Sequence, residues 1–260
     1  LAFFAFFRYT GTSRKQALFP RKRKVLDMDK MDFYTALSPT VLPLLKWYQA
    51  GHRDLPWRQN PTPYQVWISE IMLQQTRVQA VIPYYHRFLS LFPDVAALAQ
   101  APEEQLLKAW EGLGYYSRAR NLQRAARIIC DRFDGCCPTG YDDWLALPGV
   151  GPYTAGAVCS IALGLPVPAV DGNVLRVFSR LLALEDDIAA PAVKKELTAL
   201  AAALIPPDAP GEYNQALMEL GATVCLPNGT PLCQSCPISG CCRAFQEQNQ
   251  MLFPLKSPKK

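Results

Sequence analysis

Apolar residues recur at every third or fourth position along most of this chain of 260 residues, and this spacing limits the possible folds most strongly. In TPYQVWISEIMLQQT, for example, Tyr64, Trp67, Ile68 and Ile71 have the spacing of one helical face. Ser38 is expected to cap the first helix. The same spacing predicts helices over residues 38–50, 77–92, 102–114, 117–133 and 141–147. No alternating strand pattern competes, so the sequence predicts an all-α fold.

The composition allows a packed core and a polyanionic partner. Half of the residues are apolar and 19% are charged, which is typical of a globular chain. The net charge of +5 permits a nucleic-acid partner without proving one. No apolar run approaches the roughly 20 residues of a membrane span, so we expect no membrane association.

The first residues, LAFFAFFRYTGTSRKQALFPRKRK, are rich in basic residues and contain no acidic one. Such a composition suits a presequence for mitochondrial import. A translated upstream stretch is the alternative, and Met28 and Met31, just before the first globular-looking segment, favour it. We therefore expect residues 1–30 to be a non-native or disordered segment.

The cysteines are unevenly distributed. Cys225, Cys233, Cys236, Cys241 and Cys242 lie within one short segment, and the total of nine is odd. An odd count without a clear secretory signal argues against a disulfide framework and for a reducing compartment, so we expect the cytoplasm or nucleoid of a bacterium. The cluster indicates a metal site, but four thiolates alone do not separate zinc from an iron–sulfur cluster.

The stretch LPGVGPYTAGAV at residues 147–158 predicts a turn between two helices. No strand precedes it, which disfavours a dinucleotide-binding motif. We expect Gly149 and Gly151 to adopt backbone angles that other residues resist, and Pro152 to begin a helix. A helix–hairpin–helix would aim the N–H groups of Gly149, Val150 and Gly151 at a DNA phosphate. On this stretch alone, a plain helix–turn–helix connection is an equal alternative.

This hairpin, followed by AVDGNVLRVFSR and four spaced cysteines, resembles the helix–hairpin–helix superfamily of DNA glycosylases. WISEIMLQQT and EGLGYYSRARNL are similar to the adenine DNA glycosylases, which remove adenine mispaired with 8-oxoguanine or guanine. The similarity runs from about residue 38 to 245. It implies two helical lobes with DNA between them: a six-helix barrel with the hairpin over 62–164, an iron–sulfur cluster lobe over 31–61 and 165–245, and a linker or tail over 246–260.

Two carboxyl groups of different protonation suit the cleavage of a glycosidic bond, and the sequence offers Glu70 and Asp171. Apolar neighbours should raise the pKa of Glu70, although an ordinary helix edge is the common alternative. Asp171 precedes an apolar helical run and should be its N-cap, which does not prevent it from facing a cleft. The resemblance implies that Glu70 protonates adenine at N7, and that Asp171 lies beside the sugar with Asn173 assisting.

Tyr153 occupies the place where bifunctional relatives such as endonuclease III carry a lysine, which attacks C1′ and forms a Schiff base. A tyrosine cannot do so. The resemblance therefore implies a monofunctional enzyme that removes the base and leaves an abasic site. The alternative for Tyr153 is a half-buried packing residue.

The target base must leave the duplex before it can react. The resemblance implies that Gln75 enters the base stack, with Thr76 and Tyr115 beside the orphaned 8-oxoguanine. A solvated Gln75 and a core Tyr115 are the alternatives. The implied adenine pocket consists of Leu55, Trp57, Arg58 and Glu219. A basic run that could contact phosphates, or form a solvated face, comprises Arg118, Arg120, Arg124 and Arg127.

The resemblance also implies a [4Fe–4S] cluster, which the family binds with ligand spacings of x6, x2 and x5. Here the spacing is Cys225-x7-Cys233-x2-Cys236-x5-Cys242, and the extra residue lies in the turn-rich LPNGTPL. Cys241 would give x4 in the last gap, so Cys242 is the expected ligand. We expect a structural role for the cluster, with zinc as the alternative metal.

The resulting hypothesis is a monomeric, monofunctional enzyme of base excision repair. Its expected partner is double-stranded DNA with an A:8-oxoguanine or A:G mispair. A thymine-mismatch glycosylase and a non-catalytic DNA-binding module remain alternatives. In the family a second, C-terminal domain usually recognises 8-oxoguanine, and the linker to it would start near FPLKSPKK, so selectivity for 8-oxoguanine over guanine stays open.

Overall fold

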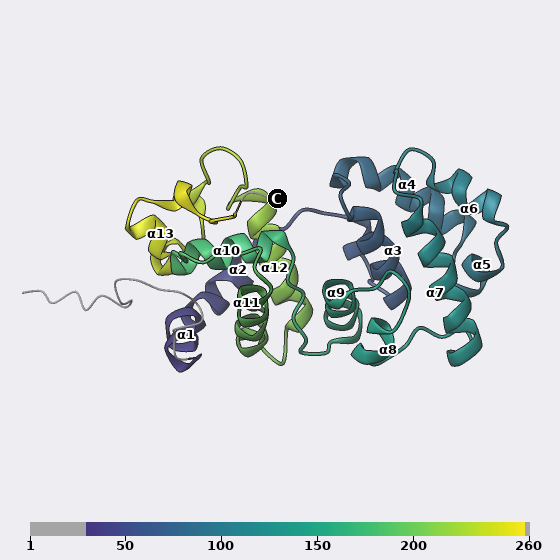
Figure 1. Cartoon of the computed structure of the whole chain (residues 1–260), viewed down its shortest axis with the longest axis horizontal. Helices are drawn as coiled ribbons and strands as arrows, with labels where there is room; N and C mark the ends of the chain where they lie inside the picture. Colours follow the sequence, from purple (N-terminus) through teal and green to yellow (C-terminus); the bar gives the residue numbers. More distant parts are fainter. Residues whose placement is uncertain (1–29, 258–260) are drawn as a thin grey trace, which may run out of the picture.

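The computed structural model describes residues 30–257, and this part contains helices and turns but no strand (Figure 1). The prediction of an all-α fold is therefore confirmed. The expectation for residues 1–30 falls on residues outside the described range, except for Lys30. The helices are α1 Lys30–Leu37, α2 Val41–Gly51, α3 Pro63–Leu73, α4 Val78–Leu91, α5 Val95–Gln100, α6 Glu103–Trp110, α7 Ser117–Phe133, α8 Tyr141–Leu145, α9 Pro152–Leu163, α10 Gly172–Leu182, α11 Pro191–Leu204, α12 Pro210–Thr223 and α13 Arg243–Gln246.

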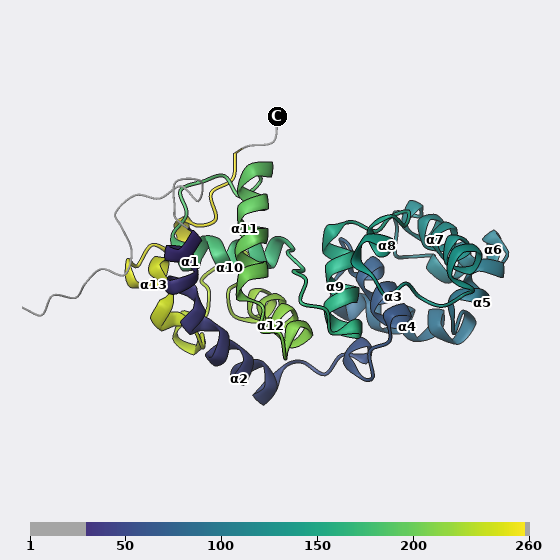
Figure 2. The same ribbon diagram turned by 90° about the horizontal axis from the view of Figure 1, so that it is seen from below.

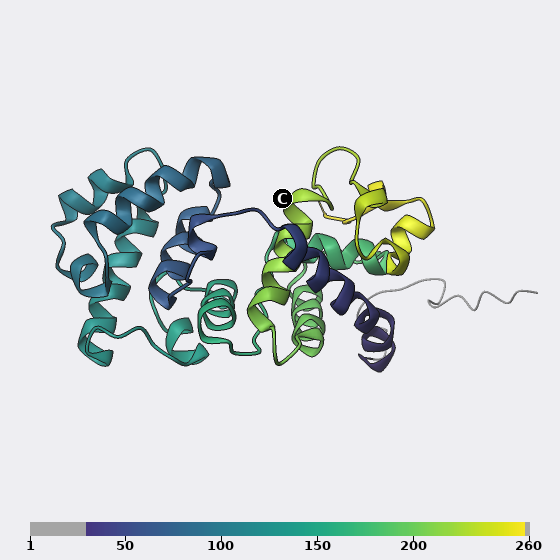
Figure 3. The ribbon, with the colours of Figure 1, turned by 180° about the vertical axis from the view of Figure 1, so that it is seen from behind.

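The helices form two lobes that stand side by side (Figures 1 and 2). Helices α3 to α9 form one lobe, which we call the barrel lobe. Helices α1, α2 and α10 to α13 form the other, the terminal lobe. Figure 3 shows the connection from α2 to α3 crossing between them. Each lobe has its own buried apolar core. Across the described range, no helix combines the length and apolar character that a membrane crossing would need.

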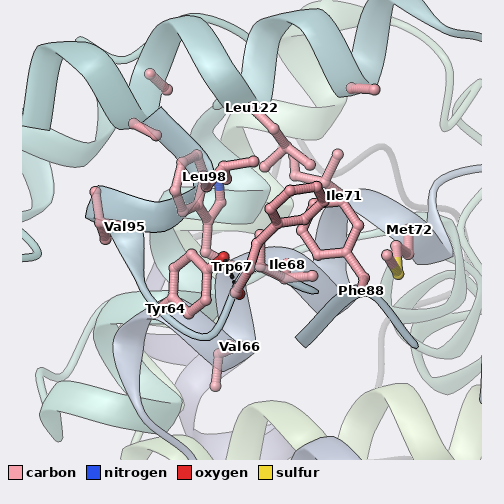
Figure 4. Close-up of a cluster of buried hydrophobic side chains, with 14 of the residues drawn as sticks. Tyr64, Val66, Trp67, Ile68, Ile71, Met72, Phe88, Val95, Leu98 and Leu122 are labelled. Carbon is pink, nitrogen blue, oxygen red and sulfur yellow. Dashed lines mark hydrogen bonds between the residues drawn. The ribbon is translucent and has the colours of Figure 1, made fainter. Parts of the chain in front are cut away.

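Helix α3 is the centre of the barrel lobe, because its apolar side chains point to every side (Figure 4). Thr62 caps its N-terminus by accepting a hydrogen bond from the Gln65 N–H at 3.2 Å. Trp67 is fully buried and packs edge to face on Trp144, with ring centroids 5.5 Å apart. The site residue Glu70 thus lies on the most buried helix of this lobe.

The structure departs from the sequence predictions at two helices. Ser38 caps nothing; it lies in the 3₁₀ turn Ser38–Thr40, which follows α1 and leads into α2. In the barrel lobe, α5 is a seventh helix where six were expected. It has only six residues, too few to show helical periodicity, although Asp94 caps it by accepting a hydrogen bond from the Ala97 N–H at 2.8 Å.

The two lobes meet where α12 packs against α9. Glycine makes this close approach possible. A Cβ atom on Gly211 of α12 would lie 2.7 Å from the carbonyl oxygen of Ser160 on α9. A Cβ on Gly156 of α9 would lie 2.0 Å from the carbonyl oxygen of Pro168. These contacts fix how far apart the facing walls of the two lobes stand.

Candidate active site between the lobes

A cavity of about 400 Å³ lies between the lobes, and α3, α9 and α12 all contribute to its walls. Most of the site residues expected from the sequence line it, although they come from distant parts of the chain. These are Glu70, Tyr153, Asp171 and Asn173, the pocket residues Leu55, Trp57, Arg58 and Glu219, and Thr76. The structure therefore brings the two expected carboxyl groups to one cavity.

Glu70 is only 7% exposed and lies in the last turns of α3. The Tyr153 hydroxyl donates a hydrogen bond to Glu70 Oε2 at 2.7 Å. Burial, with a smaller contribution from the charge of Asp171, raises the pKa of Glu70 to about 7, although Tyr153 and Arg58 pull it down. A substantial fraction of the Glu70 carboxyl groups therefore carries a proton near neutral pH.

Tyr153 occupies the second position of α9, directly after the hairpin. Its hydroxyl contacts Glu70 and lies 3.5 Å from Met218 Sδ on α12. Burial raises the pKa of Tyr153, and the nearby Glu70 adds to this effect, so the hydroxyl stays protonated and acts as a donor. This position holds a phenol facing the cavity, with no amine to form a Schiff base.

Asp171 is the N-cap of α10, as predicted. Its Oδ1 accepts a hydrogen bond from the Val174 N–H at 2.8 Å, and its Oδ2 accepts one from Asn173 Nδ2 at 2.5 Å. Burial raises the pKa of Asp171 although both hydrogen bonds favour its charged form. Asn173 Oδ1 in turn accepts from Arg176 Nη2 at 2.8 Å. The carboxyl group is therefore held in one orientation at a helix N-terminus, where negative charge is favoured.

The opposite wall carries Glu219, which is 2% exposed. Arg53 Nε donates to it at 2.7 Å and Arg58 Nη2 at 2.8 Å. Burial alone would raise the pKa of Glu219, but the hydrogen bonds from Arg53 and Arg58 outweigh it and lower the pKa to about 2. One cavity thus holds a carboxyl group with a raised pKa, Glu70, and one with a lowered pKa, Glu219.

Among the cavity residues that the sequence did not reveal are Arg53, Gln215 and Met218. Gln215 lies one helical turn before Glu219, so helical spacing could have placed it on the same face of α12. The contact of Arg53 with Glu219 joins residues 166 positions apart, and no local pattern reports such a pair.

The hairpin joins α8 to α9, and only one of its glycines needs a special backbone. Gly149 has φ +78°, and a Cβ there would lie 2.8 Å from Asn121 Cβ. Gly151 has an ordinary extended backbone with φ −102°, so that expectation is wrong for Gly151. Gly151 is the N-cap of α9, and Pro152 begins the helix. Val150 is buried, and its N–H donates to the Leu147 carbonyl at 3.1 Å, so it is not free for a phosphate.

Gln75 and Tyr115 do not line the cavity; they protrude from two turns of the barrel lobe. Both have left-handed backbones, with φ +59° and +46°. Gln75 is exposed, and Tyr115 is 64% exposed, so a core role for Tyr115 is wrong. In the basic run, Arg120 pairs with Glu103 at 2.8 Å, while the Arg118 guanidinium contacts backbone carbonyls and is not a phosphate-facing group.

The five cysteines between residues 225 and 242 lie in the terminal lobe. Cys225, Cys233, Cys236 and Cys242 line one small cavity, and Cys241 does not. Arg180 lines the same cavity, with Nη1 3.2 Å from Cys225 Sγ. Between residues 30 and 257, no three Cys, His, Asp or Glu side chains are grouped tightly enough for a single metal ion. Four thiols around one cavity are nevertheless the donor set that iron–sulfur clusters use.

Residues 68–203 match a family described as HhH-GPD superfamily base excision DNA repair protein. Adenine DNA glycosylase of Homo sapiens is 47% identical over 220 residues, which is 80% of this chain and 40% of that protein. The enzyme of the same name from Buchnera aphidicola subsp. Schizaphis graminum is 40% identical over 218 residues, 84% of this chain and 62% of that protein. The chain thus spans about half the length of the curated relatives it matches.

Two solved structures share the fold. A thermostable thymine-DNA glycosylase superposes with a TM-score of 0.73 at 28% identity, covering 84% of this chain and all of that one. A trapped covalent intermediate of endonuclease III with DNA superposes with a TM-score of 0.68 at 25% identity, covering 85% of this chain and 99% of that one.

Proposed function

We propose, because this chain belongs to the HhH-GPD superfamily of base excision DNA repair proteins, that it is a DNA glycosylase that excises adenine. It acts inside the cell as a monomer on double-stranded DNA, at adenine mispaired with 8-oxoguanine or guanine. The observation that carries the proposal is the cavity shared by Glu70 and Asp171, in which burial raises the pKa of Glu70 to about 7.

Glu70 supplies the proton that makes adenine a leaving group. Tyr153 donates to Oε2, so Oε1 is the oxygen left for the base. A carboxyl group with a pKa of about 7 is protonated often enough near neutral pH to act, and acidic enough to give the proton up. It transfers this proton to N7 as the bond between C1′ and N9 breaks, and the base leaves as neutral adenine.

Asp171 stabilises the positive charge that develops on the deoxyribose. The Val174 N–H and Asn173 hold its carboxyl group in place, so its orientation does not have to change during the reaction. Water then adds to C1′ and loses a proton, which leaves an abasic site. Tyr153 cannot form a Schiff base, and the strand is therefore not cut.

The opposite wall recognises the base. Glu219 is a fixed carboxylate that could accept a hydrogen bond from an exocyclic amine, and Arg53 and Arg58 keep it charged. Leu55 and Trp57 are largely buried in the same wall and offer apolar surface beside it. An amine donor distinguishes adenine from thymine, which carries carbonyl oxygens at the corresponding edge.

The four cysteines would hold a [4Fe–4S] cluster, with Cys225, Cys233, Cys236 and Cys242 as ligands. When bound, the cluster contributes a structural anchor for the loops of the terminal lobe, and the excision uses no electrons from it. The buried Arg180 beside Cys225 would compensate part of the negative charge of the thiolates.

A panel of duplexes that carry A:8-oxoguanine, A:G, T:G and C:G pairs tests the proposal. The released base is identified by chromatography. We expect adenine from the first two duplexes and no base from the others. The DNA strand should break only after alkali treatment, because the enzyme leaves an intact abasic site. Release of thymine from T:G alone would refute the proposal.

Thymine excision is the second candidate function, because the thymine-DNA glycosylase structure superposes over the whole of its length. The same panel separates the two candidates. A third possibility, a DNA-binding module without catalysis, predicts that no base is released from any duplex.

A further inference from the structure

Arg118, in the first turn of α7, directs its guanidinium into the barrel lobe. Its Nη1 donates to the carbonyl oxygens of Ile71 at 2.8 Å, Met72 at 3.0 Å and Gln74 at 2.6 Å. Its Nη2 donates to those of Leu113 at 2.9 Å and Gly114 at 3.2 Å. One guanidinium therefore bridges two turns about 40 residues apart in the sequence.

The first turn follows α3, the helix that carries Glu70. The carbonyls of Ile71 and Met72 belong to the last turn of this helix, where no further N–H can pair with them. A cation at a helix C-terminus is also favoured by the helix dipole. Arg118 thus fixes the end of the helix that carries the proposed acid.

Both turns contain a strained residue with an exposed side chain. Gln75 and Tyr115 have φ values of +59° and +46°. The left-handed region is unfavourable for a residue other than glycine, so the surrounding structure must impose it. Arg118 accounts for this constraint, because it binds the carbonyl directly before each residue, that of Gln74 and that of Gly114. Its guanidinium also lies 5.7 Å from the centre of the Tyr115 ring.

We propose that Arg118 is a positioning residue that sets the spacing between Gln75 and Tyr115 and locks both to the helix of Glu70. This inference rests on the proposed function and on the roles that the family resemblance implies, in which Gln75 and Tyr115 contact the duplex while Glu70 receives the flipped base. Arg118 touches neither the base nor the reacting atoms. It holds the side chains of Gln75 and Tyr115 in a fixed position relative to each other and to the cavity.

The role requires an arginine. A planar guanidinium carries five donors in a fixed fork, and here it serves acceptors on two sides at once; a lysine ammonium has three donors on one atom. Neither of two other arginines of α7 could replace it. Arg120 pairs with Glu103 at the surface, and Arg127 donates to the Ala99 carbonyl at 3.1 Å.

The test compares Arg118→Lys with the matched control Arg127→Lys, which alters another carbonyl contact of the same helix. Single-turnover excision is measured on an A:8-oxoguanine duplex and on a duplex with adenine opposite an abasic site. The second adenine has no pairing partner and needs less help to leave the stack. Hydrogen exchange of residues 71–76 and 112–116 is measured on the free protein.

We expect Arg118→Lys to slow excision on the paired duplex by about tenfold or more. The loss on the unpaired duplex should be much smaller, and exchange in both turns should be faster. Arg127→Lys should change none of these. An equal loss on both duplexes, or no loss, would overturn the inference, because a general folding defect affects both substrates alike.

Failure of the proposed function gives a different result. In that case the unsubstituted protein releases no adenine, and hydrogen exchange alone tests the positioning role of Arg118. Faster exchange in both turns of Arg118→Lys supports the positioning role, and unchanged exchange overturns it.

Discussion

The Tyr153 hydroxyl donates a hydrogen bond of 2.7 Å to Glu70 Oε2, and this contact joins the start of α9, directly after the hairpin, to α3. The bond lowers the pKa of Glu70 while burial raises it, and the balance lies at about 7. In the proposed function, the residue whose phenol excludes Schiff-base chemistry therefore also adjusts the strength of the proposed acid.

Tyr153→Phe should move the alkaline limb of the pH–rate profile to higher pH. Glu70 acts in its protonated form, so the single-turnover rate of excision should fall as pH rises above about 7 in the unsubstituted protein. Phenylalanine removes the donor that stabilises the Glu70 carboxylate, so the proton is held more tightly. The measurement is the pH at which the alkaline limb falls in single-turnover pH–rate profiles, and it does not depend on the maximal rate of each variant. A limb that moves to lower pH would contradict this account.

Glu70→Gln should stabilise the fold at alkaline pH. The pKa of Glu70 is about 7 in the folded protein and 4.5 without the protein environment, so the folded state holds the proton more tightly. Between these values, stability falls as pH rises, and above pH 7 the folded protein bears the whole cost of a buried charge. Glutamine removes a penalty of about 3 kcal/mol at pH 8 and almost nothing at pH 4. Urea unfolding at both pH values measures the difference.

The two arginines that contact Glu219 should contribute unequally. The Arg58 side chain is 10% exposed and that of Arg53 is 37% exposed, so water screens the Arg53 pair more. Arg58→Met should destabilise the protein by about 2 kcal/mol, and Arg53→Met by less. Denaturant unfolding of the two variants under identical conditions gives the comparison. Equal losses would indicate that burial does not set the strength of these pairs.

Cys242→Ser should abolish binding of the cluster, and Cys241→Ser should preserve it. Only Cys242 of this adjacent pair lines the cavity shared with Cys225, Cys233 and Cys236. The assay is iron per protein chain together with the visible absorbance of the purified variants. The unsubstituted protein should be yellow-brown. A colourless protein that contains zinc would refute the iron–sulfur assignment.

Local patterns predicted those parts of the fold and site that depend on neighbouring residues. The spacing of Tyr64, Trp67 and Ile71 identified a helix with an apolar face, and Asp171 before an apolar run identified an N-cap. Glu70 among apolar neighbours indicated a raised pKa, and the structure places that carboxyl group in a buried setting of this kind. These inferences needed only the helical repeat and the chemistry of a few adjacent side chains.

Contacts between distant segments could not be predicted in this way. The pairing of Arg53 with Glu219 depends on how the two lobes meet. Arg118 was expected among surface arginines, because its sequence neighbours do not reveal the carbonyls of Ile71 and Gln74 that receive its donors. Gly151 was misjudged because a glycine beside a proline can also be an ordinary helix cap.

The most direct test of the central claim is the rate of adenine release from an A:8-oxoguanine duplex by Glu70→Gln. Glutamine keeps the shape of the side chain and removes the transferable proton. The account predicts that release slows by about 10²–10⁴-fold while the affinity for the duplex is unchanged. A Glu70→Gln variant that releases adenine as fast as the unsubstituted protein would contradict it.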